Sequence, residues 1–138
     1  MAETIQGPRI EVGFAGNKRV TAEFLGFRVH SDQPTKAGGD GSAPSPFDLF
    51  FASLATCAGY FVLEFCTSRG IPLDGVRLTQ GFERDAATRR VTAVHLDITV
   101  PDGFPEKYRN AVAQAAASCT VKKLLEHPPA MDIRVRVD

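Results

Sequence analysis

The stretch from Ser45 to Gly70 limits the fold most, because it is an apolar segment of helical length with its own start and stop signals. It carries no charged residue between Asp48 and Glu64. Ser45 followed three residues later by Asp48, with Pro46 at the first helical position, is typical of a capped helix start. Gly70 is typical of a helix end. We therefore predict one helix over this stretch.

This helix has no polar side. From Leu49 to Leu63 every angular position is apolar, small or uncharged, so all sides need cover. The run is shorter than the roughly 20 residues that span a bilayer, which favours a core over a membrane. The 138 residues fit one domain, residues 1–138, but one copy can hardly bury such a helix. We predict a homodimer with this helix at its centre.

Charge and cysteine content limit the partners. Sixteen basic and sixteen acidic side chains cancel, and without a basic run we expect no binding to nucleic acid or membrane. The first residues lack the features of a secretion signal, so we expect a cytoplasmic protein with reduced thiols. The cysteines are odd in number and form no Cys-x-x-Cys, which argues against a structural disulfide framework. The histidines lie far apart in sequence, so we expect no metal site and no cofactor.

Alternating apolar residues predict strands on both sides of the helix. Residues 9–15 and 20–24 form a hairpin by this pattern, and 27–29 continue it as a third short strand. A second hairpin is predicted at 76–82 and 94–100, and a last strand at 131–137. The order predicts an α+β domain with antiparallel sheets. Residues 31–44 are rich in Gly, Ser, Asp and Pro without the pattern of a phosphate loop, which predicts a flexible linker.

A second helix is predicted from about Glu106, with a break inside it. The apolar stripe slips by nearly half a turn near Ser118, so a new short helix begins there, capped by Ser118 or Thr120. Cys119 then lies at a helix N-terminus, three and four residues before Lys122 and Lys123. Both features favour the thiolate form of Cys119.

Small residues surround Cys57 and precede Cys119, so the two helices can approach closely and bring these two sulfurs together. Cys66 lies nine residues after Cys57 on the same helix, which at about 100° per residue puts it on the opposite side. We expect Cys66 to be an inert core residue.

These features together resemble a known family. The strand hairpin, the glycine-rich segment, Ser-Pro-Phe-Asp-Leu with Cys57 nine residues after the Asp, and Ser-Cys-Thr-Val-Lys-Lys around Cys119 resemble osmotically inducible protein C and the organic hydroperoxide resistance proteins. The resemblance implies the OsmC-like fold and an intertwined dimer with sites at its interface. It also implies that Cys57 attacks a peroxide and that Cys119 resolves the product as a disulfide.

The residues that would assist Cys57 follow less directly. Better-studied peroxidases of the family have a Glu ten residues before the first cysteine, working with an Arg from the N-terminal part. Here Phe47 holds that position and Asp48 follows it. Asp48 is either a helix cap or a residue that orients the thiolate or the peroxide. Arg19 and Arg28 are both candidates for the arginine, and each is equally compatible with a solvated strand position.

The aromatic residues of the helix offer a pocket for an apolar substrate, with Phe47, Phe50, Tyr60 and Phe61 as candidates. The resulting expectation is a peroxidase that reduces organic hydroperoxides through Cys57 and Cys119 and is recycled by an external dithiol. The alternative is a non-catalytic protein of the same fold that binds a small hydrophobic ligand. The missing Glu keeps this alternative open.

Overall fold

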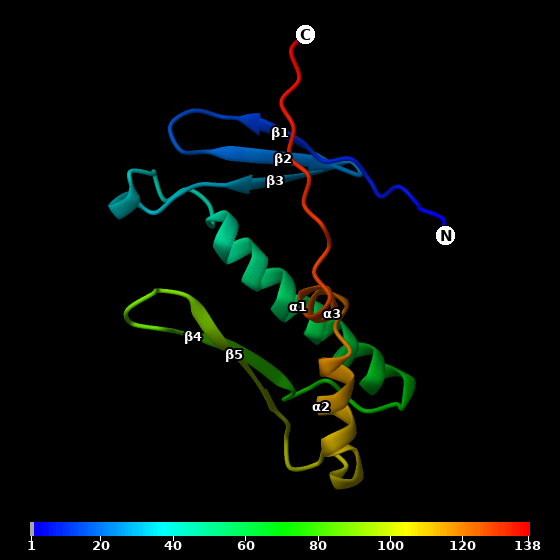
Figure 1. Ribbon diagram of the computed structural model, residues 1–138. Helices are drawn as coiled ribbons and strands as arrows, with labels where there is room; N and C mark the ends of the chain where they lie inside the picture. The colour runs from blue at the N-terminus through cyan, green and yellow to red at the C-terminus, as the bar shows by residue number, and fades with distance from the viewer. Residues whose placement is uncertain (1) are drawn as a thin grey trace. The chain divides into compact units, whose positions relative to one another are not determined.

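The computed structural model describes residues 2–138. The chain forms two compact units, one ending at Ala52 and the other beginning at Ser53. Each unit contains its own antiparallel sheet, of three strands in the first and two in the second (Figure 1).

The sheet of the first unit has the order β1-β2-β3, with β1 at Glu11–Phe14, β2 at Val20–Phe24 and β3 at Phe27–Ser31. The predicted hairpin and its third strand are both present. Only Leu25 and Gly26 separate β2 from β3, with φ of 50° and 80°. Positive φ at both central residues is the turn geometry that matches the twist of a two-residue hairpin.

The segment after β3 is not the flexible linker that its composition predicts. Asp32 is fully buried and its carboxylate accepts hydrogen bonds from Gln33 N (2.7 Å), Ser42 N (3.0 Å) and Ser42 Oγ (2.6 Å). A short 3-10 turn at Thr35–Ala37 lies inside this loop. A Cβ atom at Gly39 would lie 1.9 Å from the carbonyl oxygen of Gln33, so the loop closes only with glycine there. The hydrogen bonds of Asp32 and the close backbone approach at Gly39 therefore fix the conformation of this loop.

Helix α1 runs over Pro46–Ser68, close to the predicted bounds. It begins with the expected capping box, because Asp48 N donates to Ser45 Oγ (3.2 Å) and Ser45 N donates to Asp48 Oδ2 (3.3 Å). One stripe of the helix is buried, consisting of Leu54, Ala58, Val62, Phe65 and Cys66. Its other sides keep exposed aromatic and aliphatic residues, so one copy leaves much of the helix uncovered.

The full length of α1 also weakens the length argument against a membrane. With 23 residues and a mean hydropathy of 1.7 in its most apolar window, the helix is long and apolar enough to cross a bilayer. Core helices of soluble proteins have the same length and composition. The buried stripe, which packs against the elements of the second unit, gives the helix a role in a protein core.

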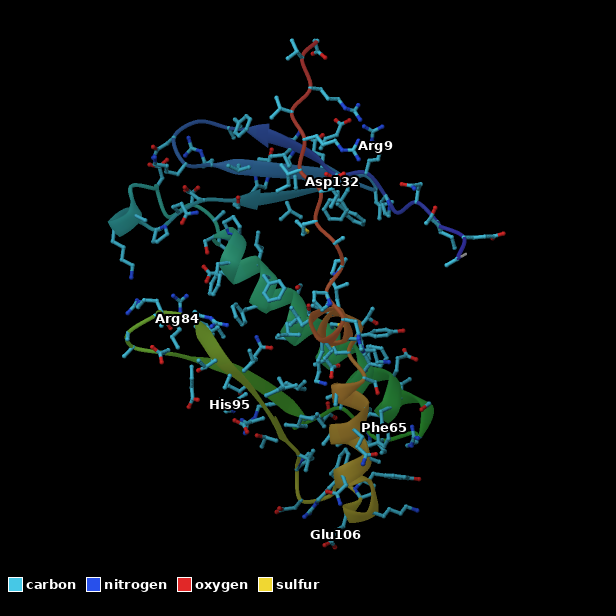
Figure 2. All side chains as sticks on the ribbon, viewed as in Figure 1. Arg9, Phe65, Arg84, His95, Glu106 and Asp132 are labelled. Carbon is cyan, nitrogen blue, oxygen red and sulfur yellow. The ribbon has the colours of Figure 1, made fainter. Side chains whose placement is uncertain are left out.

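The second unit packs the rest of α1 with a hairpin and two short helices. Strands β4 (Arg77–Arg84) and β5 (Val91–Thr99) are antiparallel, and Figure 2 shows His95 on this hairpin. Helix α2 covers Arg109–Ala117 and α3 covers Thr120–Glu126. The core of this unit joins the buried α1 stripe with Ile71, Phe104, Val112 and Ala116. Phe65, which is labelled in Figure 2, lies beneath the Arg69 guanidinium at 3.8 Å and edge-on to Tyr108.

The strand predicted at 131–137 is absent from the described chain. Residues 127–138 form neither helix nor strand, although they keep the alternating pattern of a strand. The apolar members of this pattern, from Met131 at 81% to Val137 at 94%, are exposed. An alternating segment becomes a strand only when a sheet edge supplies hydrogen bonds and cover, and within the described residues this segment pairs with no strand.

The buried Asp32 predicts how the first unit responds to acid. Hydrogen bonds from Ser42, first its hydroxyl and then its N–H, with one from Gln33 N, lower the pKa of Asp32 from 3.8 to about 2. Because the folded pKa lies below the unfolded one, the stabilisation is complete above about pH 4 and is lost as the pH falls towards 2. Asp32→Asn should lower the urea midpoint at pH 7 and flatten its pH dependence between pH 2 and 4.

The control is Asp102→Asn, which changes an exposed carboxylate in another loop and should keep the wild-type slope. Urea unfolding of the three proteins across pH 2–6 makes the comparison. An unchanged slope in Asp32→Asn would show that another group causes the acid sensitivity.

Candidate functional site

The candidate site begins at the break between α2 and α3. Cys119 is the N-cap residue of α3, with a non-helical backbone (φ −51°, ψ 127°), and its carbonyl accepts the first helical hydrogen bond from Lys123 N (3.0 Å). The predicted break is therefore present. The predicted caps are wrong: α3 has no side-chain cap, and Ser118 Oγ donates backwards to the carbonyl of Gln114 (3.2 Å).

The start of α3 faces the sulfur of Cys57. The Cys119 thiol hydrogen-bonds to Cys57, and the backbone N–H groups of Val121 and Thr120 donate to the same sulfur. These contacts, with the Cys119 thiol first, lower the pKa of Cys57, although partial burial opposes them. Donors aimed at a sulfur favour its negative form, because a thiolate accepts stronger hydrogen bonds than a thiol. The arrangement favours Cys57 as a thiolate.

Cys119 has the opposite environment. The residue is 1% exposed, and its Sγ lies 3.8 Å from the carbonyl oxygen of Leu54. Burial, followed by the hydrogen bond to Cys57, raises the pKa of the Cys119 thiol. The expectation that the helix N-terminus and lysines favour a Cys119 thiolate is therefore wrong. Lys122 instead pairs with Glu126 at 3.4 Å.

The two thiols therefore have different environments although they lie side by side. Cys57 is partly exposed and favours the charged form, whereas Cys119 is buried and favours the neutral form. Two neighbouring titratable groups whose pKa values are pushed apart take different chemical roles. A partly exposed thiolate is suited to attack an electrophile, and a neighbouring thiol can then react with the product.

Cys66 takes no part in this pair. It is completely buried in the core of the second unit, and burial raises the pKa of its thiol. All three cysteines are free thiols. Within residues 2–138, no group of three His, Cys, Asp or Glu side chains is arranged to hold a metal ion.

A cavity of about 320 Å³ lies beside Cys119, inside the second unit. Its walls come from α1, the β4–β5 hairpin and the two short helices, and most of them are aliphatic or alanine side chains. The alternating residues Leu96 and Ile98 of β5 form one wall, and Lys122 of α3 also lines the cavity. The sequence pattern does not reveal this cavity, although the alternation in β5 marks the wall residues as inward-facing.

The aromatic residues predicted to line a pocket do not line this one. Phe47, Phe50 and Tyr60 are between 38% and 54% exposed, and Phe61 is half-buried. Phe47 packs on Phe51 with ring centroids 4.9 Å apart, and Tyr60 packs edge-on to Phe61 at 5.4 Å. In a single copy these aromatic residues lie on the surface of α1, because they are not part of its buried stripe.

The charged candidates are engaged elsewhere in the first unit. Arg19 Nη1 lies 2.6 Å from Asp40 Oδ2, and Arg28 pairs with Glu23 across the β2–β3 hairpin. Asp48 is held in the capping box at the start of α1. The contacts of Asp48 are therefore those of a helix cap. Arg19 and Arg28 each have a carboxylate partner in the first unit.

Comparison with known proteins decides the family. Residues 39–134 match the family model described as OsmC-like protein, which covers more than half of the chain and includes both cysteines of the pair. The chain belongs to the OsmC-like protein family. The predicted family and the α+β, OsmC-like fold are confirmed. None of the curated proteins matches the sequence.

Solved structures agree with this OsmC-like assignment. A protein with a proposed role in osmotic stress and detoxification, from Psychrobacter arcticus, has a TM-score of 0.71 and 28% identity, covering 86% of this chain and 89% of that one. The organic hydroperoxide resistance protein OsmC of Legionella pneumophila gives 0.58 and 19%, covering 89% and 91%. A proposed organic hydroperoxide resistance protein of Vibrio cholerae gives 0.55 and 20%, covering 91% and 88%.

Proposed function

We propose that this OsmC-like protein is a thiol-dependent peroxidase that reduces organic hydroperoxides. The observation that carries the proposal is the pair of neighbouring thiols with separated pKa values, Cys57 lowered and Cys119 raised. A peroxidase of this type needs one thiolate to attack the peroxide and one thiol that waits beside it.

The reaction has three steps. The Cys57 thiolate attacks one oxygen of the hydroperoxide, which breaks the O–O bond, forms a sulfenic acid on Cys57 and releases an alkoxide that takes a proton to become an alcohol. The Cys119 sulfur then attacks the sulfenic sulfur, forming the Cys57–Cys119 disulfide and releasing water. An external dithiol finally reduces this disulfide and is oxidised to its own disulfide, so two electrons pass from the dithiol to the peroxide.

The names of relatives support an organic rather than an inorganic peroxide. Relatives of the same fold in Legionella pneumophila and Vibrio cholerae bear names of organic hydroperoxide resistance proteins. The proposal places the reaction in the cytoplasm, where dithiols are kept reduced, with no part for nucleic acid or membrane.

The contacts of the arginines favour a second candidate, a non-catalytic protein that binds a small hydrophobic ligand. Arg19 and Arg28 are both paired with carboxylates of their own unit, and Phe47 stands where the better-studied peroxidases have a Glu. Without an arginine at the thiolate, peroxide would be poorly oriented, and the apolar cavity would then hold a ligand that is not consumed. The cysteine variants separate the two candidates.

Single cysteine substitutions test the peroxidase. Cys57→Ser should lower the turnover rate of an alkyl hydroperoxide at least 100-fold, because the attacking thiolate is gone. Cys119→Ser should still consume about one equivalent and then stop or over-oxidise, because the sulfenic acid has lost its partner. Peroxide consumption with dithiothreitol, comparing cumene hydroperoxide with hydrogen peroxide, measures both effects.

Cys66→Ser is the matched control, because it removes a thiol of the same helix that lies outside the pair. It should keep most activity and lose about 1 kcal/mol of stability from placing a hydroxyl in the core. Wild type that leaves cumene hydroperoxide untouched while all three cysteines stay reduced would favour the ligand-binding candidate.

We also propose that the active protein is a homodimer. The exposed apolar side chains on α1 and along residues 131–137 form more apolar surface than a monomeric soluble protein usually leaves in water. A second copy of the chain is always present as a partner, and a two-fold interface would cover the same residues on both copies.

The assembly is measured by light scattering after size exclusion at low micromolar concentration. We expect twice the chain mass of 14.9 kDa. Replacing Tyr60 and Leu63 by Ser and Gln on the exposed side of α1 should weaken the dimer at least tenfold. A wild-type protein with the mass of one chain would contradict the proposal.

A further inference from the structure

Of the two cysteines of the pair, only Cys119 lines the cavity. Cys119 is among the residues that line it, together with Leu54 and Ala58 of α1 and Ala116 of α2, and Cys57 is not. Cys57 instead receives the N–H groups of Val121 and Thr120. The two sulfurs therefore have different approaches, although they belong to one reacting pair. A peroxide needs the partly exposed Cys57, which leaves the cavity side of the pair without a role in the first step.

We propose that the cavity is the entry site for the reducing dithiol, which attacks the disulfide at Cys119 and releases Cys57. The inference rests on the proposed peroxidase function, because it concerns the step that regenerates the thiols. It assigns the cavity to the reductant and gives the buried cysteine a second role, as the sulfur that carries the transient mixed disulfide.

The bonds and electrons balance as follows. One thiolate of the dithiol forms a bond to Cys119 Sγ, the Cys57–Cys119 bond breaks, and Cys57 leaves as a thiolate. The second thiol of the reductant loses its proton and attacks the reductant sulfur bound to Cys119, which releases Cys119; Cys119 then takes up a proton. The dithiol becomes a disulfide after giving two electrons, and both protein sulfurs are reduced again.

The surroundings of the two sulfurs favour this direction of attack. In thiol–disulfide exchange the sulfur with the lower thiol pKa is the better leaving group. Cys57 is that sulfur, because the Cys119 thiol and two N–H groups stabilise its thiolate. Attack from the other side would have to release Cys119 as a thiolate into a buried, mostly apolar setting, which burial disfavours.

The walls of the cavity suit a short dithiol with an aliphatic chain. Its volume of about 320 Å³ is at the lower end of small-molecule sites, and aliphatic side chains supply most of its surface. Lys122 also lines the cavity, but its ammonium is paired with Glu126, so the apolar walls are what select the reductant. An anionic tripeptide thiol such as glutathione is bulkier and more polar, and it fits these walls less well.

The first experiment identifies the sulfur that is attacked. The protein is oxidised to its disulfide with diamide, so that no peroxide activity is needed, and is then mixed with excess 2-mercaptoethanol, which cannot complete the second step as a dithiol does. Acid quenching, alkylation with N-ethylmaleimide and peptide mass mapping follow. We expect the mercaptoethanol adduct on Cys119 and the maleimide on Cys57. The adduct on Cys57, or no disulfide with diamide, would overturn the proposal.

The second experiment tests the route. Ala113 lies on α2 in the cavity lining, and Ala113→Leu places three more carbon atoms there, whereas Gln114→Leu adds the same side chain at an exposed neighbouring position outside the lining. Both replacements use a good helix former. Reduction of the diamide-formed disulfide by dithiothreitol should be at least tenfold slower in Ala113→Leu and unchanged in Gln114→Leu.

These experiments separate the two proposals. The first attack of peroxide on Cys57 should keep its wild-type rate in Ala113→Leu, because the cavity is not its route. Equal reduction rates in both variants, or equal slowing of both steps in Ala113→Leu, would overturn the cavity route. If diamide-oxidised protein behaves as expected but no hydroperoxide is consumed, the proposed peroxidase function alone fails.

Discussion

The contact between the sulfur of Cys57 and the first turn of α3 is the interaction on which the chemistry of this protein depends. It exists because the second helical segment breaks at Ser118 and restarts at Thr120, which turns backbone N–H groups toward α1. Buried alanines, Ala58 on α1 and Ala116 on α2, belong to one core and leave room for that approach. The same break makes Cys119 an N-cap residue, so one backbone feature places a neutral thiol beside a favoured thiolate.

Much of this arrangement could be predicted from the sequence, since local signals were strong. The capping box at Ser45 gave the start of α1, and the slip of the apolar stripe gave the break before α3. Periodicity gives the position of a residue on its own element but not which neighbour its groups face. For this reason the sequence predicts that the N-terminus of α3 favours a Cys119 thiolate, whereas the N–H groups of Thr120 and Val121 reach Cys57, and burial raises the pKa of Cys119.

Other features lay outside what composition can indicate. The loop after β3 is held by the buried Asp32 and by the close approach at Gly39, and both depend on backbone turns that a glycine-rich, polar sequence does not specify. The apolar alternation of residues 131–137 identifies a segment able to form a strand, but pairing needs an edge as well as a pattern. Similarly, the apolar sides of α1 indicate that the helix is covered on all sides, but a single copy leaves part of it exposed.

The most direct test of the account is the titration of Cys57. Its rate of alkylation with iodoacetamide is measured as a function of pH, and peptide mass mapping separates the three cysteines. The account predicts a pKa for Cys57 below that of an ordinary thiol, and an upward shift in Cys119→Ala, because the Cys119 thiol is the largest cause of the lowering. A Cys57 that titrates like a free cysteine, or that keeps its lowered pKa without Cys119, would contradict it.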